Sequence, residues 1–288
     1  MRWDFPYDSP SQITELLDRH GLAMSRRFGQ NFLLSKEIRT RIVSALELDG
    51  TEHVWEIGPG IGNITSYLID SKADITAFEI DRGFISILRD HAFKDVENFT
   101  LIEGDFLKTW ESVLAEKGTP DVICGNLPYN VGSVIIGRLL EKQVLPKKMA
   151  FTLQKEVIGR ITGESDTKNW STLSILSQVD FEVKQLFTIK AGAFYPPPNV
   201  DSAVILYTRR DTPLVPDEKR ELFFTIVHDL FSSRRKTMRN NLLHGSLASS
   251  LPKEKIIDRI EQSQFDPMTR GEVYSIAQLL ELTDLFLD

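Results

Sequence analysis

Short apolar runs alternate with helix-length amphipathic stretches over most of the chain, and this alternation is typical of α/β proteins. The apolar runs that we expect to form strands are 53–57, 74–79, 99–103, 121–124 and 149–153, with further β-like runs at 181–190 and 203–208. The stretches that we expect to form helices are 11–20, 63–71, 82–93 and 133–143. The pattern therefore predicts a Rossmann-like parallel sheet with helices between its strands.

The pattern changes after Arg210, because from there on only helical stretches follow, separated by prolines. We therefore place a domain boundary near Asp211. We expect an N-terminal extension over 1–25, a main domain over 26–210 and a smaller, all-helical domain over 211–288. Within the main domain the run from Phe194 to Pro198 ends in three prolines, so we expect a stiff loop there rather than a paired strand.

The composition is that of a globular protein, because 41% of the residues are hydrophobic and 26% are charged. No apolar stretch approaches the roughly 20 residues that a membrane-spanning helix needs, and residues 1–10 lack the pattern of a secretory signal. A single cysteine, Cys124, excludes an internal disulfide, and the five histidines are too widely spaced to suggest a metal site. We expect a cytoplasmic monomer that holds no metal.

The net charge of −7 argues against a chain that binds nucleic acid merely by being basic. Basic residues are nevertheless concentrated in two segments. The first contains Arg26, Arg27, Lys36, Arg39 and Arg41, and the second contains Arg234, Arg235, Lys236 and Arg239. Each segment could be a solvated face, but two such clusters in an acidic protein favour phosphate binding.

A glycine-rich turn follows the expected strand 53–57, in the sequence Glu56-Ile57-Gly58-Pro59-Gly60-Ile61-Gly62. Glycines here let the backbone approach a ligand closely, but Asn63 stands where a dinucleotide-binding fingerprint has its third glycine. The turn therefore favours a nucleoside with a short charged tail over a dinucleotide. In many proteins such a turn is purely structural.

Two acids stand at the ends of the next two expected strands. Glu79 closes one of them, where an acid typically accepts hydrogen bonds from ribose hydroxyls. Asp105 follows the other, where a carboxylate can accept from the amine of an adenine, with Phe106 or Ile80 covering the ring. A single acid at such a position is more often a helix cap, but the two together predict an adenosine pocket at the carboxyl edge of the sheet.

The tetrapeptide Asn126-Leu127-Pro128-Tyr129 follows the next expected strand. Methyl transfer to an exocyclic amine needs acceptors for the amine hydrogens, so that the nitrogen lone pair points at the donor. The Asn126 side chain and the Leu127 carbonyl, held by Pro128, have this chemistry, and Tyr129 offers a face on which an extruded base can stack. The alternative is an asparagine-proline turn with a tyrosine packed on the core.

Five segments of the chain resemble, in the same order, those of the ribosomal RNA adenine dimethyltransferases. They are Gly29 to Leu33, Glu56 to Gly60, Asn126 to Tyr129, Gln154 to Glu156 and Phe194 to Ser202. The C-terminal string from Arg234 to Leu242 is similar to that of the bacterial small-subunit enzymes within this family. The resistance enzymes that act on large-subunit rRNA do not share this string.

The resemblance implies a class I methyltransferase fold with S-adenosyl-L-methionine as the methyl donor. The implied targets are two adjacent adenosines near the 3′ end of small-subunit (16S) rRNA, each dimethylated on N6 in a reaction coupled to subunit assembly. By position, the residues implied to hold the cofactor are Gln30, Asn31, Leu33, Gly58, Gly60, Glu79, Ile80, Asp105, Phe106 and Asn126. The resemblance also implies that Tyr129 and Phe194 sandwich the target adenine, and that Arg234, Arg235, Lys236 and Arg239 contact rRNA.

Three other functions stay open at this point. The chain could be an assembly factor that binds the immature small subunit and methylates it only incidentally. It could also methylate large-subunit rRNA. A DNA adenine methyltransferase is the third alternative, although a short helical tail offers little for reading a base sequence.

Overall fold

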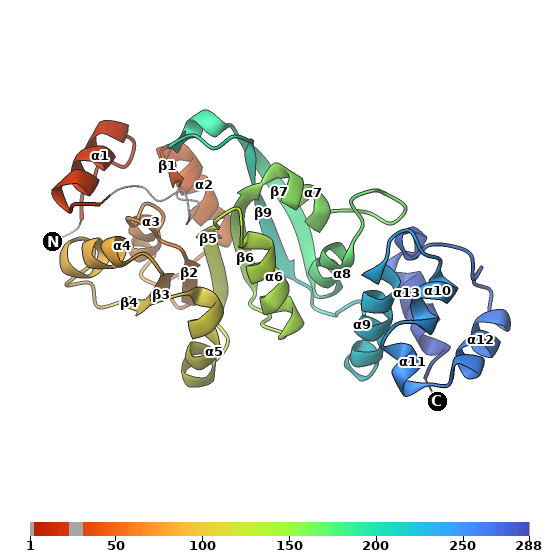
Figure 1. The fold of residues 1–288 in the computed structure, drawn as a ribbon. Coiled ribbons are helices and arrows are strands. Elements are labelled where there is room, and N and C mark those ends of the chain that lie inside the picture. The colour runs from red at the N-terminus through yellow and green to blue at the C-terminus, as the bar shows by residue number, and fades with distance from the viewer. Residues whose placement is uncertain (1–2, 23–30, 288) are drawn as a thin grey trace. The chain divides into compact units, whose positions relative to one another are not determined.

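The structure of the chain is a computed structural model that describes residues 3–22 and 31–287 (Figure 1). The chain forms two compact units. The first consists of residues 1–158 and 184–209, and the second of residues 159–183 and 210–288. The second unit resumes at Arg210, next to the expected boundary, but it also takes in the segment 159–183, which the sequence pattern assigns to the main domain.

A seven-stranded sheet with the order β4-β3-β2-β5-β6-β9-β7 organises the first unit. Its strands are β2 (His53–Ile57), β3 (Asp74–Glu79), β4 (Phe99–Glu103), β5 (Val122–Asn126), β6 (Lys148–Gln154), β7 (Phe181–Ile189) and β9 (Ser202–Arg209). The first five in the sheet order pair in parallel, and β9 lies antiparallel to β6. The predicted α/β fold is confirmed, but the sheet is mixed. The segment between β7 and β9 contains the short 3-10 helix η3 (Ala191–Ala193) and the two-residue strand β8 (Phe194–Tyr195), and not the crossover helix that a further parallel strand needs.

Helices lie between the strands of the first unit along the chain. They are α2 (Lys36–Leu46), α3 (Thr65–Asp70), α4 (Arg82–Ile87), α5 (Phe106–Lys117) and α6 (Gly132–Glu141). The expected helix 82–93 is α-helical only to Ile87 and continues as the π-helix η2 (Leu88–Ala92). The start of α4 is fixed by Asp81, whose carboxylate accepts the N–H groups of Gly83 at 2.9 Å and Phe84 at 3.2 Å.

A separate two-stranded sheet joins β1 (Phe32–Leu33) to β8 (Phe194–Tyr195). The strands are antiparallel, with Phe32 opposite Tyr195 and Leu33 opposite Phe194. The expectation of an unpaired loop over Phe194 to Pro198 is therefore wrong for its first two residues. The prolines themselves lie outside any strand, because proline has no N–H to donate.

The N-terminal residues 3–22 pack onto the first unit instead of forming an appendage. The helix α1 (Pro10–Arg19) and the aromatic residues before it share an apolar cluster with Phe32, Ile61 and Phe84. The Tyr7 hydroxyl donates a buried hydrogen bond to the Ile61 carbonyl at 3.0 Å. This segment therefore packs against the glycine-rich turn and stabilises it.

Arg39 is buried, so the expectation that it contacts phosphate is wrong. Only 2% of the residue is exposed, and its guanidinium donates to the carbonyls of Leu33 at 2.9 Å and Leu34 at 2.7 Å. Its charge is balanced by Asp8, which accepts from the guanidinium at 2.5 Å. Within the same basic segment, Arg41 lies 3.8 Å from the ring centroid of Phe187, while Arg26 and Arg27 lie outside the described residues.

The second unit is helical. Its elements are α8 (Thr172–Val179), α9 (Asp217–Ser232), α10 (Met238–Leu243), α11 (Leu247–Ser250), α12 (Lys253–Glu261), η4 (Gly271–Val273) and α13 (Ile276–Asp284), and α7 (Lys155–Ile161) leads into it. Trp170 and Val179 share one apolar cluster with α9 and α13, and the Trp170 indole donates to the Tyr274 carbonyl at 2.9 Å. A buried ion pair joins Asp180 to Arg220 on α9. These contacts explain why the segment 159–183 belongs to this unit.

The helices of the described chain are all too short or too polar to cross a membrane.

Candidate active site and cofactor cavity

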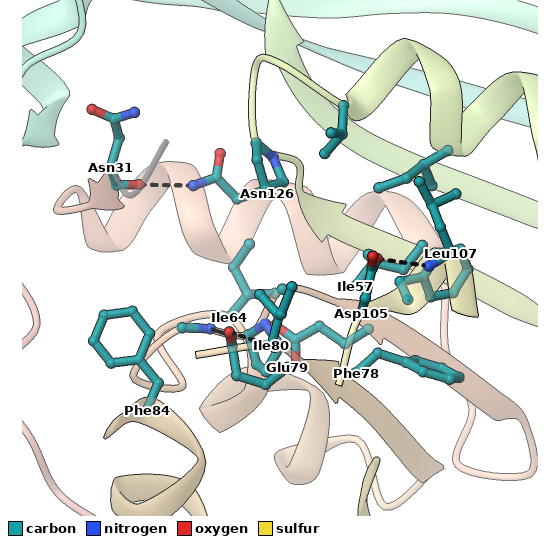
Figure 2. Close-up of a pocket in the computed structure, with 18 of the residues that line it drawn as sticks. Asn31, Ile57, Ile64, Phe78, Glu79, Ile80, Phe84, Asp105, Leu107 and Asn126 are labelled. Atoms are coloured by element: carbon teal, nitrogen blue, oxygen red, sulfur yellow. Dashed lines mark hydrogen bonds between the residues drawn. The ribbon is translucent and has the colours of Figure 1, made fainter. Parts of the chain in front are cut away.

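A cavity of about 360 Å³ lies in the first unit, where the carboxyl ends of β2, β3, β4 and β5 meet (Figure 2). This edge is the expected ligand crevice of a sheet with parallel strands. Many of the residues assigned from the sequence line it, namely Asn31, Gly58, Gly60, Glu79, Ile80, Asp105, Phe106, Asn126 and Pro128. The structure thus brings the ends of four strands and the segment before β1 to one site.

The glycine-rich turn needs its glycines for conformation. Gly58, Gly60 and Gly62 have φ angles of 70°, 61° and 90°, which residues with side chains rarely adopt. A Cβ atom at Gly62 would also lie only 2.7 Å from the ring of Phe93. The turn leaves the backbone of Gly58 and Gly60 at the wall of the cavity.

Glu79 is buried at the end of β3 and ties the glycine-rich turn to the turn after β3. Its Oε2 accepts the N–H of Gly60 at 2.9 Å, and its Oε1 accepts those of Ile80 at 2.9 Å and Asp81 at 2.8 Å. Burial raises the pKa of Glu79 to about 7, because these three donors only partly offset the loss of water. A carboxylate has about four acceptor positions, so roughly one remains for a ligand hydroxyl.

Asp105 is a helix cap, which the sequence analysis gave as the alternative to a ligand-binding role. It is the N-cap of α5, and its Oδ1 accepts the N–H of Leu107 at 3.0 Å (Figure 2). It also lines the cavity. The next residue, Phe106, is fixed by an edge-on contact with Phe78, with 5.0 Å between the ring centroids. Both rings form part of the apolar wall.

The Asn126 side chain is held in one orientation. Its Nδ2 donates to the backbone carbonyl of Asn31 at 2.8 Å, as the dashed line in Figure 2 marks. Because only the amide nitrogen can donate to a carbonyl, this contact assigns the two ends of the amide. Oδ1 therefore points away from Asn31 as an acceptor. Close packing holds the strand before it, since a Cβ atom at Gly125 would lie 2.4 Å from the Ile57 carbonyl oxygen.

Other assigned residues do not line the cavity. Leu127 and Leu33 are buried in the core, and Gln30 lies outside the described residues. The Tyr129 hydroxyl shares a hydrogen bond of 2.5 Å with Ser202, and this partner belongs to the Phe194 to Ser202 segment. Phe194 itself is 2% exposed and packs in an apolar cluster with Leu33. The structure thus brings Tyr129 and this segment together, but leaves the Phe194 ring inside the core.

Glu56 is a cavity residue to which the sequence analysis assigned no role. It lies on β2, is 1% exposed, and its Oε2 has no hydrogen-bond partner among the described residues. Burial raises the pKa of Glu56 to about 8, with a further contribution from the charge of Glu79 and a partial offset by Thr65. Glu56 could have been recognised in the sequence as an acid within a strand that was expected to be buried, where charged residues rarely stand without a partner. Phe32 and Phe84 also line the cavity, and the sequence assigned neither of them a site role.

The basic string of the second unit surrounds the start of α10. Arg235 and Lys236 are exposed, whereas Arg234 is engaged with Glu272 at 2.7 Å and with the Lys168 carbonyl at 2.9 Å. Arg239 lies 3.7 Å from Glu261 at the surface.

The fold adds a second loop to this surface. Backbone hydrogen bonds from Met238 to Thr269 at 2.7 Å and from Arg239 to Pro267 at 3.2 Å join the basic string to residues 266–270. The exposed Arg270 therefore extends the basic surface, a position that the sequence analysis did not assign to RNA.

Metal chemistry has no candidate site within residues 3–22 and 31–287, because no three His, Cys, Asp or Glu residues are grouped to hold an ion. Cys124 is fully buried on β5. Burial, and to a lesser extent the carboxyl of Glu56, raise its thiol pKa well above the usual value, so this thiol is unreactive.

A sequence model of the ribosomal RNA adenine dimethylases matches residues 21–281. The chain belongs to this family. Among its relatives, a protein of Treponema denticola is 42% identical over 281 residues, covering 97% of this chain and 95% of its own length. A protein of Lactococcus lactis is 38% identical, with 95% and 93% covered. Both are named ribosomal RNA small subunit methyltransferase A.

Solved structures of related enzymes have the same fold. A dimethyladenosine transferase from Plasmodium falciparum superposes with a TM-score of 0.69 at 22% identity, covering 86% of this chain and 94% of its own. The 23S rRNA methyltransferase ErmE superposes with a TM-score of 0.66 at 25% identity, covering 88% and 99%. The class I methyltransferase fold is thus confirmed, and the chain is an rRNA adenine dimethylase that uses S-adenosyl-L-methionine.

Proposed function

We propose that this enzyme dimethylates N6 of two adjacent adenosines near the 3′ end of small-subunit rRNA, during assembly of that subunit. The choice of the small subunit is supported by the names of the relatives that match nearly the whole chain. The basic string from Arg234 to Arg239, which is similar to that of the small-subunit enzymes, supports it independently. We further propose that the enzyme acts as a monomer in the cytoplasm, where it meets assembling subunits.

The cavity of about 360 Å³ is within the usual range for a small-molecule site. Its lining suits S-adenosyl-L-methionine, because it combines an apolar wall with acidic groups and glycine backbone. We assign the remaining acceptor position of Glu79 to the ribose hydroxyls and Asp105 to the adenine amine, with Ile80 and Phe106 against the ring. Gly58 and Gly60 would lie along the methionine part. When bound, the cofactor supplies an electrophilic methyl group, and the protein binds and orients it.

The orientation of Asn126 is the single observation that supports the reaction most strongly. Because its Nδ2 is committed to Asn31, its Oδ1 is left to accept a hydrogen from the N6 amine of a target adenosine. We propose that the Leu127 carbonyl accepts the other hydrogen, which turns the nitrogen lone pair toward the methyl group. With the cofactor bound, this orientation would let the lone pair form the C–N bond while the electrons of the breaking S–C bond stay on sulfur, and water would take the proton that nitrogen releases.

The target base needs an apolar face outside the stack of its own strand. We propose that the Tyr129 ring provides this face and that its hydrogen bond to Ser202 holds the ring in place. The same stacking on Phe194 requires that ring to leave the apolar cluster around Leu33. Phe194 is therefore a second stacking residue only after such a movement.

We propose that Arg235, Lys236 and Arg270 hold rRNA phosphates, together with Arg234 and Arg239. Reversing Arg235 and Lys236 together to Glu is expected to weaken binding to small subunits more than tenfold and to flatten its salt dependence. Lys253→Glu on α12, also exposed, is the matched control. The affinity for cofactor is expected to stay unchanged, and its loss in the double variant would instead point to a folding defect.

The reaction is tested with labelled S-adenosyl-L-methionine and small subunits that lack the modification, compared with large subunits and duplex DNA. We expect N6,N6-dimethyladenosine in the small subunit only, and a loss of more than about a hundredfold in turnover for Asn126→Ala. Label in large subunits or in DNA would contradict the proposed target. Tight binding to small subunits without any label would favour a pure assembly factor.

A further inference from the structure

The cofactor cavity is acidic. Three carboxyl groups line it, from Glu56, Glu79 and Asp105, and no Lys, Arg or His does so among the described residues. Glu79 and Asp105 accept backbone N–H groups, whereas the Oε2 of Glu56 has no partner in the described part of the chain. A cavity with this distribution of charge favours a cationic ligand over an anionic or a neutral one.

Glu56 is the carboxyl group that depends most on what fills the cavity. Glu56 is buried and Thr65 only partly offsets the loss of water around its carboxyl group, so the ionised form is disfavoured unless a positive charge lies near it. The ionisable groups around it are Glu79 on β3, Cys124 on β5 and Tyr7 in the N-terminal segment, with the Thr65 hydroxyl on α3. These neighbours supply no cation. Burial and Glu79 together raise the pKa of Glu56 to about 8, in keeping with a proton on Glu56 in the empty cavity.

The methyl donor and the product of the reaction differ by one positive charge. S-Adenosyl-L-methionine carries a sulfonium cation, and S-adenosyl-L-homocysteine carries a neutral thioether, while the rest of the two molecules is the same. A positive charge acts on a carboxyl group much more strongly in a buried cavity than in water. Both molecules keep the ammonium and carboxylate of the amino-acid part, so the sulfonium is the one charge by which they can act differently on Glu56.

We propose that Glu56 is protonated in the empty cavity, gives up its proton when the cationic methyl donor binds, and thereby makes the site favour the donor over the thioether product. After methyl transfer the positive charge at sulfur is gone, Glu56 takes up a proton again, and the product is held less tightly. The inference rests on the use of S-adenosyl-L-methionine and is independent of the rRNA target.

The test is isothermal titration calorimetry of the full chain near pH 7 in two buffers with different ionisation enthalpies. The dependence of the heat on the buffer gives the number of protons released per ligand bound. We expect about one proton for S-adenosyl-L-methionine and clearly fewer for S-adenosyl-L-homocysteine. Sinefungin, in which an amine carries the positive charge, is expected to behave like the donor. Equal proton release for donor and product, or no release with the donor, would overturn the proposal.

The assignment to Glu56 is tested with Glu56→Gln, which keeps the shape of the side chain and removes its ionisation. This variant is expected to lose most of the proton release and to reduce the preference for donor over product on the order of tenfold, the factor that matches one pKa unit. Glu111→Gln, at an exposed position on α5, is the matched control and is expected to titrate like the unmodified chain. Proton release that persists in Glu56→Gln but disappears in Glu79→Gln would refute the assignment.

The titration of the unmodified chain keeps the proposal falsifiable even where Glu56→Gln fails to fold. A chain that binds the donor with proton release but labels no small subunit would refute the proposed rRNA target and leave this inference standing. A chain that labels small subunits but binds the donor without proton release would refute this inference and leave the proposed rRNA target standing. The two failures are therefore distinguishable.

Discussion

Asp8→Asn tests whether the N-terminal segment holds the wall of the cofactor cavity. The Arg39 guanidinium donates to the carbonyls of Leu33 and Leu34, directly after the cavity residue Phe32, and Asp8 is its charged partner. The Arg39 side chain is only 3% exposed, whereas that of Asp8 is 57% exposed. Asp8→Asn therefore leaves the buried guanidinium of Arg39 with a neutral partner. Water can partly replace the lost interaction, because the side chain at position 8 is exposed.

The expected size of the effect follows from this geometry. Breaking a fully buried pair costs about 3–5 kcal/mol, and a hydrogen bond to a charged group contributes about 1.5–3 kcal/mol. Because Asp8 is half in water, we expect the lower figure, about 1.5–3 kcal/mol, which lowers the melting temperature by roughly 4–10 °C. Loosening of the strand that carries Phe32 is also expected to weaken binding of S-adenosyl-L-homocysteine severalfold.

Differential scanning calorimetry and isothermal titration calorimetry measure the two effects. Asp18→Asn is the matched control, because Asp18 is an exposed acid on α1 that has no part in the Arg39 contacts. A melting temperature and a ligand affinity equal to those of Asp18→Asn would refute the reasoning. Lower stability with unchanged affinity would show that the segment stabilises the fold without shaping the cavity.

Further outcomes follow from buried groups elsewhere in the chain. Asp180→Asn leaves Arg220 buried without its charged partner, so the helical unit is expected to lose about 3–5 kcal/mol, measured by urea denaturation followed by circular dichroism. Gly125→Ala places a Cβ atom 2.4 Å from the Ile57 carbonyl oxygen, so turnover is expected to fall at least tenfold as β5 shifts, checked by single-turnover methylation. Burial raises the pKa of Glu56 from 4.5 to about 8, so its contribution to stability is full below pH 4.5 and is lost as pH rises through 8. The melting temperature of the cofactor-free chain is expected to fall over this range, and less steeply in Glu56→Gln.

The strands could be predicted well because local sequence decides them. The runs 53–57, 74–79 and 99–103 coincide with β2, β3 and β4, since each is an apolar run of strand length with turn residues at both ends. The short strands β1 and β8 could not be predicted in the same way. Two residues have no periodicity, and their pairing joins segments far apart in the sequence, so it depends on the rest of the fold.

The predicted site differs from the observed one mainly in which charged residues are buried. Glu79, Asp105 and Asn126 stand at strand ends, where the sequence locates them relative to a ligand crevice, and they line the cavity. In the sequence, Arg39 and Glu56 cannot be told apart from charged residues that lie in solvent. Tertiary packing buries both of them, so that Arg39 holds neighbouring backbone carbonyls and Glu56 is left with an unpaired carboxylate oxygen. The segment 159–183 joined the helical unit for the same reason, because the partners of Trp170 come late in the chain.

The distribution of charge explains how one acidic chain can process a polyanion. A cavity lined by carboxyl groups, without a basic side chain among the described residues, favours a cationic methyl donor and offers a buried phosphate no compensating positive charge. The neutral ring of an adenine can approach it without such a penalty, whereas the backbone of the RNA cannot. Phosphate binding must therefore come from other surfaces, and the exposed Arg235, Lys236 and Arg270 of the helical unit have the required charge. With the proposed phosphate contacts, this separation of the two charges lets the chain bind the cationic donor and the anionic rRNA at the same time.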